Sequence, residues 1–215
     1  MHHSSAVRLA SLLAPLFLIL MLPVGSVAEV VINEVLADPV SDWSGDGIID
    51  FKNDEWVEIA NAGPDPVDLD GYWLSDAGTD PAVRYRFSGS LASGETFVVT
   101  GAMAVAWQMD TGNGSAGLSL SNSGGEVALF HDVGAETTQV DLIAYVSYQM
   151  DDDRSLGRFP NAGEDWILYD GLNIYHGNQI PGSTGCLPSF GTANVCEHTP
   201  AGDANWGRVK SHYGG

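Results

Sequence analysis

The sequence predicts an all-β fold, an antiparallel β-sandwich or barrel, for the chain that follows residue 28. Short segments rich in β-branched and aromatic residues recur there at near-regular spacing. Clusters of Gly, Pro, Asn and Asp separate these segments, as turns do. No long segment there follows the 3.6-residue period of a helix. About 130 residues of this pattern suffice for one hydrophobic core, so we expect one β-sandwich with a long C-terminal extension.

The individual strands are predicted from the alternation of apolar and polar residues. Val57 and Ile59 alternate with Trp56, Glu58 and Ala60, which is the pattern of a half-buried strand. The predicted strands are residues 30–39, 54–63, 67–69, 72–75, 83–87, 96–100, 126–130 and 139–145.

The aromatic residues divide into two groups. Those of the first strands are expected in the core or in cross-strand pairs, with an exposed sugar-binding platform as the alternative: Trp56, Tyr72, Trp73, Tyr85 and Phe87. Those that follow are expected to be partly exposed in irregular structure: Tyr145, Tyr148, Trp166, Tyr169 and Tyr175.

The N-terminus has the pattern of a secretory signal peptide, residues 1–28. A short start carrying Arg8 precedes an apolar run at 9–22, and small residues at 25–28 offer a cleavage point before Glu29. The run is short for a membrane span, which needs about 20 apolar residues, so an uncleaved anchor is the less favoured interpretation. We therefore expect a secreted protein, extracellular, periplasmic or at the cell surface, with no stable membrane span in the mature chain.

The mature chain is strongly acidic. Without residues 1–28 it has 7 basic and 28 acidic residues, a net charge of −21. Nucleic-acid binding depends on basic patches that displace counterions from phosphates, so this charge argues against nucleic-acid partners. A divalent cation is the partner that this charge favours.

One acidic segment, residues 42–54, follows the spacing of a calcium-binding loop. Oxygen-bearing side chains stand at its first, third, fifth and ninth positions, and glycine stands at the sixth, where such loops turn sharply. Asn53 replaces the usual glutamate at the twelfth position, and Asp54 follows it. A solvated acidic turn is the alternative. The predicted Ca²⁺ ligands are Asp42, Ser44, Asp46, the Ile48 carbonyl and Asp50, with Asp54 or Asn53 closing the site.

The two cysteines, Cys186 and Cys196, are expected to form a disulfide in an exported protein. Closing such a loop contributes roughly 3 kcal/mol in the chain-entropy model. A redox or metal-binding role is disfavoured, because the spacing is far from Cys-x-x-Cys.

No catalytic constellation stands out. The histidines after residue 28 are scattered without metal-ligand spacing: His131, His176, His198 and His212. The acidic runs at 151–153 and 164–165 are expected to be solvated turns; a second cation at 151–153 is less favoured, because that run lacks a glycine turn and alternation. We therefore expect no enzyme.

The order of several segments resembles the lamin-tail domain family, in its bacterial secreted form. The segments are VINEV (31–35), EWVEIAN (55–61), VDLDGYWLSD (67–76), YRFSGSLASGETFVVTG (85–101), LSNSGGEVALF (120–130), VDLIAY (140–145) and SLGRFPNAGEDW (155–166). The resemblance implies an immunoglobulin-like β-sandwich. The acidic insertion at 38–54 is similar to one in bacterial members of the family.

The resemblance also implies a domain organisation and a class of function. We expect a signal peptide at 1–28, a lamin-tail-like sandwich at 29–166, a Gly/Pro-rich extension at 167–202 and a C-terminal tail at 203–215 that is either a docking tail or a frayed terminus. The implied function is a non-catalytic binding or scaffold module for a cell-envelope or extracellular protein or glycan. The alternatives are a carbohydrate-binding module and an accessory domain of a secreted hydrolase or nuclease system.

Overall fold

The computed structural model describes residues 30–196, so the predicted signal peptide and the predicted tail lie outside the described residues. The described elements are β1 (Val30–Leu36), β2 (Trp56–Asn61), β3 (Val67–Asp68), β4 (Tyr72–Ser75), β5 (Tyr85–Arg86), β6 (Ser90–Leu91), β7 (Thr96–Thr100), α1 (Gly101–Thr111), β8 (Gly124–Val133), β9 (Glu136–Val146), the 3-10 turn η1 (Ser147–Gln149), β10 (Ser155–Phe159) and β11 (Asp165–Tyr169). No helix among residues 30–196 is long and apolar enough to cross a membrane.

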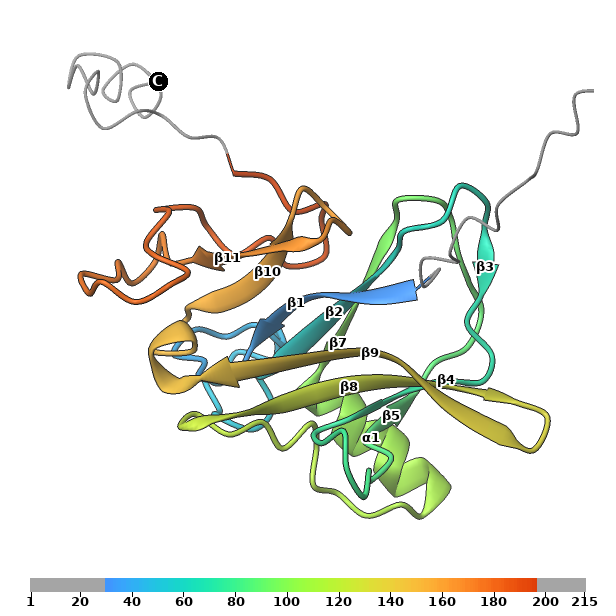
Figure 1. Cartoon of the computed structure of the whole chain (residues 1–215). Helices are drawn as coiled ribbons and strands as arrows, with labels where there is room; N and C mark the ends of the chain where they lie inside the picture. The colour runs from blue at the N-terminus through green and yellow to red at the C-terminus, as the bar shows by residue number, and fades with distance from the viewer. Residues whose placement is uncertain (1–29, 197–215) are drawn as a thin grey trace, which may run out of the picture.

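The strands form an immunoglobulin-like β-sandwich, as predicted (Figure 1). One sheet has five antiparallel strands in the order β11-β10-β1-β2-β7, and the other has four in the order β5-β4-β8-β9. A short pair, β3 with β6, forms a third sheet. Apolar side chains from both large sheets make one core, for example Ile32, Ile59, Leu74 and Leu129.

A bulge in β1 decides which of its side chains face this core. The pairing of β1 with β2 shifts between Ile32 and Glu34. Val30, Ile32 and Val35 all belong to the core, whereas strict alternation would place Glu34 there. The bulge therefore turns Glu34 to the face of the five-stranded sheet that lies away from the core.

The eight predicted strand segments all contain strands, but the pattern missed three short ones. Strand β6 follows a glycine turn, and β10 and β11 lie in the C-terminal part where no strand was predicted from periodicity. The predicted boundary at residue 166 falls inside β11. The C-terminal part thus contributes two of the five strands of one sheet.

The sequence indicated no long helix after residue 28, and the structure contains an 11-residue helix that the pattern did not indicate, α1 at Gly101–Thr111. The Thr100 hydroxyl accepts a hydrogen bond from the Met103 N–H, and the helix ends at Gly112 with φ 73°. Its buried residues are small or polar: Gly101, Ala104 and Gln108. A helix that buries so few large apolar residues leaves no stripe for a sequence pattern to detect.

The disulfide segment covers the outer face of the five-stranded sheet. We call residues 186–196 the strap. Phe190 packs against Trp56 of β2, with ring centroids 5.5 Å apart, and Gly191 donates its N–H to the Glu58 carboxylate. Asn194 donates to the Asn33 carbonyl of β1. The strap is therefore a third layer on this sheet.

Candidate functional site

The acidic loop between β1 and β2 has the sharp turn that its sequence predicts. Gly45 and Gly47 have φ values of 77° and 86°, a region that favours glycine. The Asp42 carboxylate accepts hydrogen bonds from the backbone N–H groups of Gly45, Asp46 and Gly47, at 2.8, 3.2 and 2.8 Å. One carboxylate thus fixes the turn in which the calcium pattern places its glycine.

A second carboxylate closes the loop from inside. Asp54 is completely buried, and its two oxygens accept the N–H groups of Ser44 and Asp50, each at 2.7 Å. The Asp50 side chain in turn accepts from the N–H groups of Lys52 and Asn53. Asp54 therefore binds both halves of the loop together.

The six predicted calcium ligands share this loop but differ in exposure. Asp42, Asp46 and Ile48 are exposed, Ser44 and Asp50 are half-buried, and Asp54 is buried. Among residues 30–196, three acidic ligand atoms come within 4.8 Å of one another at Asp38, Asp151 and Asp152, and no such group forms in the loop. The donors are carboxylate, hydroxyl and carbonyl oxygens, the set that a hard cation such as Ca²⁺ prefers.

The expected solvated turn at 151–153 is only partly correct. Asp151 and Asp152 are exposed, but Asp153 is 3% exposed. Its carboxylate accepts the N–H groups of Val40 and Ser41, at 2.9 and 3.2 Å, the Trp43 indole N–H at 2.8 Å, and the Ser41 hydroxyl. Asp153 therefore anchors the start of the acidic loop to the chain before β10.

A buried polar network lies between the five-stranded sheet and the strap. Glu34 and Glu58 face each other in the pairing of β1 with β2, and neither side chain is exposed. Burial raises the pKa of each carboxyl group to about 7. The alternation of β2 predicted that Glu58 lies on the solvent-exposed face of a half-buried strand. That predicted exposure is wrong, because the strap covers this face.

A third buried carboxyl group lies next to the acidic loop. Burial raises the pKa of Glu55 to about 8, and its side chain accepts the Leu120 N–H at 3.2 Å. Glu55 therefore ties the start of β2 to the segment before β8. Neither its burial nor that of Glu34 has a signal in the sequence, because both follow from segments distant along the chain.

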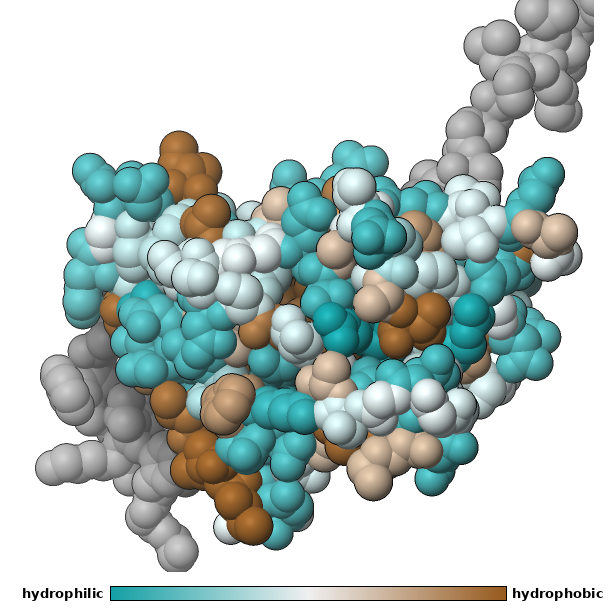
Figure 2. Space-filling model, turned by 90° about the horizontal axis from the view of Figure 1, so that it is seen from below, coloured by the Kyte–Doolittle hydropathy of each residue, from teal (hydrophilic) through white to brown (hydrophobic). Residues whose placement is uncertain are grey.

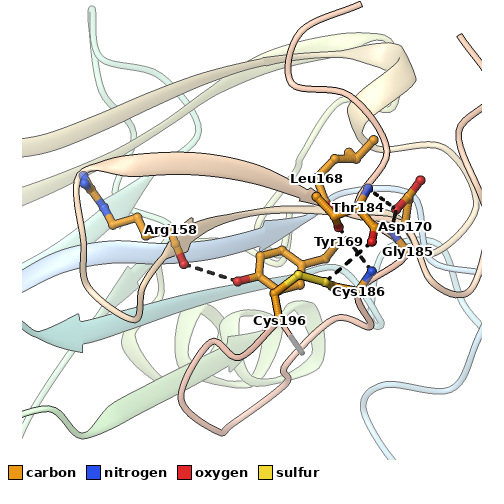
Figure 3. Close-up of a disulfide and its surroundings, with 8 residues drawn as sticks. All are labelled: Arg158, Leu168, Tyr169, Asp170, Thr184, Gly185, Cys186 and Cys196. Carbon is orange, nitrogen blue, oxygen red and sulfur yellow. Dashed lines mark hydrogen bonds between the residues drawn. A yellow bond between two sulfur atoms is a disulfide. The ribbon is translucent and has the colours of Figure 1, made fainter. Parts of the chain in front are cut away.

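The disulfide between Cys186 and Cys196 is present, with Cα atoms 5.3 Å apart (Figure 3). The Cys186 carbonyl accepts the Gly171 N–H at 2.7 Å. The neighbouring Gly185 donates its N–H to the Asp170 carboxylate at 2.7 Å. The start of the strap is therefore fixed to the chain that leaves β11.

The aromatic residues of the first strands are packed as predicted. Trp56, Tyr72, Trp73 and Phe87 are buried, and Tyr85 packs against the core. Two later aromatic residues contradict the expected exposure: Tyr145 and Tyr169 are 3% and 0% exposed. Tyr169 is buried because it belongs to β11, an element that the sequence pattern did not indicate.

One pocket contains an aromatic pair and two carboxylates. It has a volume of about 410 Å³ and is lined by Pro66, Val67, Asp68, Asp70, Tyr72 and His131. The Tyr72 and His131 rings are stacked, with centroids 4.0 Å apart and planes inclined by 5°. Carboxylates beside aromatic rings are groups that can bind sugar hydroxyls.

Comparison with known proteins supports a single assignment. No curated protein matches the chain. The family model described as Lamin Tail Domain matches residues 23–147, more than half of the sequence and all strands from β1 to β9. Members of that family are non-enzymatic, immunoglobulin-like domains that act in protein interactions. The chain therefore belongs to the lamin tail domain family.

Proposed function

We propose that this protein is a secreted, calcium-stabilised binding module that contacts a cell-envelope or extracellular protein through its acidic loop. The observation that carries the proposal is the loop tip, where Ile48, Ile49 and Phe51 are 66%, 61% and 70% exposed. Large apolar side chains exposed together are typical of interaction sites. The loop that presents them is fixed by Asp54 and Asp153, so little conformational entropy is lost on binding.

The rest of the surface supports a site of limited size. On the face shown in Figure 2, most of the surface is hydrophilic and the hydrophobic residues form separate groups. The net charge of the mature sequence also disfavours polyanionic partners. Secretion is supported by the signal-peptide pattern and by a disulfide, which persists in oxidising compartments.

We expect Ile48→Ser and Phe51→Ser to weaken capture of the partner from native envelope or culture fluid at least tenfold. Each change removes an apolar contact without altering a hydrogen bond that holds the loop. The control is Val133→Ser, which changes a residue 64% exposed at the end of β8. Equal capture by all three variants would exclude the loop tip as the binding site.

Calcium is assigned to the same loop, with Asp42, Ser44, Asp46, Asp50, Asp54 and the Ile48 carbonyl as the residues that would hold it. The bound ion would offset the repulsion between carboxylates and fix the exposed side of the loop. The fixed Asp42 turn and the all-oxygen donor set support this assignment.

Excess calcium is expected to raise the melting temperature above that in chelator. At a concentration tenfold above the dissociation constant, binding adds about 1.4 kcal/mol to the free energy of unfolding. Asp46→Ala should abolish the rise and the heat of titration, whereas Asp110→Ala, an exposed acid on α1, should leave both intact. If the unmodified chain melts at the same temperature with calcium and with chelator, the loop is a solvated turn that binds no calcium.

Glycan binding is the second candidate, and the pocket beside Tyr72 and His131 favours it. The exposed carboxylates of Asp68 and Asp70 would bind hydroxyl groups at the rim. A glycan array distinguishes the two candidates. Signal that is lost in Asp70→Asn and kept in Phe51→Ser would establish the glycan site instead of the loop.

A further inference from the structure

Among residues 30–196, Glu34 and Glu58 form a buried carboxylate pair with no opposite charge beside it. They lie on adjacent strands, directly opposite each other. In the described part of the chain, the four arginines form ion pairs with Asp76, Asp132, Asp151 and Asp141, and the Lys52 ammonium group donates to the Ser115 carbonyl. Two adjacent carboxylates that are buried without a cation cannot both be ionised at low cost.

The strap is what buries this pair. Ser189 donates its hydroxyl group to one Glu34 oxygen at 2.5 Å and its N–H at 3.3 Å, while Gly191 donates its N–H to Glu58 at 3.0 Å. From below the strap, Ser155 of β10 donates its hydroxyl to Glu34 and Asn33 donates its amide to Glu58. Lifting the strap would rehydrate both carboxylates and leave the core of the sandwich closed.

The other groups around the pair are neutral. Strand β11 contributes Tyr169, whose pKa is raised by burial and then by the two glutamates. Strand β7 contributes the Thr96 side chain to Glu58, and β10 contributes Ser155 to Glu34. The strap contributes Ser189, Gly191 and Asn194, none of which titrates. The charge of the interface is therefore set by the pair itself.

The hydrogen bonds indicate which glutamate holds a proton. Two of the partners of Glu58 are N–H groups, from Asn33 and Gly191, which cannot accept in return, and one is the Thr96 hydroxyl. Glu34 is bonded to two hydroxyl groups, of Ser155 and Ser189, and a hydroxyl group can rotate to accept. Glu34 has more partners that can accept a proton from it, so we assign the shared proton to Glu34.

We propose that the strap is a proton-dependent cover: it closes over the outer sheet face when Glu34 is protonated and lifts when both glutamates are ionised. The strap has one large apolar contact with the sheet, Phe190 on Trp56, and its other contacts there are mostly polar. Its Leu187 and Val195 are 58% and 63% exposed, and its contacts with Glu34, Glu58 and Asn33 are polar. Lifting it would expose Trp56 and the pair to solvent.

The direction of the pH dependence follows from the raised pKa values. Glu34 and Glu58 shift from an ordinary pKa of 4.5 to about 7 in the closed state. A raised pKa means that the closed state binds protons more tightly than the open one. The stabilisation of the closed strap is therefore complete below pH 4.5 and is lost as the pH rises through about 7.

Hydrogen exchange of the intact, disulfide-bonded chain tests the cover. We expect protection of the Gly191 amide, corrected for intrinsic exchange, to fall about tenfold per pH unit between about pH 4.5 and 7 and to level off above 7, while amides of the β1–β2 ladder stay protected. Glu34→Gln keeps the shape and needs no proton, so protection of its Gly191 amide should stay constant over the same pH range. Glu136→Gln, at an exposed site on β9, should behave as the unmodified chain does.

Two results would overturn the proposal: protection of Gly191 that does not change with pH in the unmodified chain, or a fall that persists in Glu34→Gln. If Glu34→Gln does not fold, a pH titration of the Glu34 carboxyl ¹³C chemical shift in the unmodified chain tests the proposal instead. A midpoint near 7 agrees with the proposal, and a midpoint near 4.5 refutes it.

Discussion

Arg158→Ala is expected to lower the free energy of unfolding by about 3 to 5 kcal/mol, the usual effect of removing one partner of a buried ion pair. Arg158 of β10 and Asp141 of β9 are each 13% exposed, and one guanidinium nitrogen lies 2.9 and 3.1 Å from the two carboxylate oxygens. The guanidinium also donates to the Ile32 carbonyl, and Asp141 accepts the Ile32 N–H at 2.8 Å. The pair thus joins β9, an edge strand of the four-stranded sheet, to β10 and β1 of the five-stranded sheet.

Urea unfolding of the chain and the variant measures this loss. The matched control is Arg86→Ala, since Arg86 also pairs with an aspartate and lies over an aromatic ring, but its side chain is 42% exposed. An exposed pair contributes at most about 1 kcal/mol, so the control should remain close to the unmodified chain. Equal losses for both variants would show that the bridge between the sheets adds nothing beyond a surface pair.

Asp153→Ala is expected to lower the free energy of unfolding by about 3 kcal/mol, because this one carboxylate accepts four hydrogen bonds from residues 40–43. Its removal leaves the N–H groups of Val40 and Trp43 without their acceptor. Asp153 also has φ 63°, a conformation that Asp and Asn adopt more readily than Ala. The same change should weaken calcium affinity, because the ligand loop begins at Asp42.

Asp153→Asn tests whether the loop depends on the hydrogen bonds of the Asp153 side chain or on its charge. Its amide oxygen can still accept from Val40 and Trp43, its amide group can donate to the Ser41 hydroxyl, and asparagine tolerates the positive φ. Thermal unfolding should show a loss of about 1 kcal/mol for Asn against about 3 for Ala. Identical melting of the Ala variant and the unmodified chain would contradict the role of Asp153 as the loop anchor.

The C-terminal part of the chain matters more to the fold than its sequence pattern suggested. The match to the lamin tail domain ends at residue 147, and the segment 167–202 was expected to be an extension. In the structure β10 pairs with β1, β11 pairs with β10, and Arg158 reaches the opposite sheet. The pairing of β10 with β1 joins residues more than a hundred positions apart, a distance over which local periodicity carries no information.

The exposure of Glu58 was mispredicted for the same reason, because a distant segment covers it. The alternation of β2 places Glu58 on the sheet face that lies away from the core, and that placement is correct. Whether that face meets water depends on the strap, which is 133 residues away along the chain at Gly191.

Helix α1 was missed for a local reason: its buried face is built from Gly101, Ala104 and Gln108 and carries no apolar stripe.

The sequence alone determined what local chemistry encodes: strands from alternation, turns from glycine, the burial of Tyr72 and Phe87 in the core, the pairing of Cys186 with Cys196, and the family. Only the tertiary structure decided what long-range contacts create, namely the strap as a third layer, the Glu34–Glu58 pair beneath it and the buried anchor Asp153. The reason is physical, because burial and pKa depend on which distant segment covers a side chain, and period and composition describe only its neighbours along the chain.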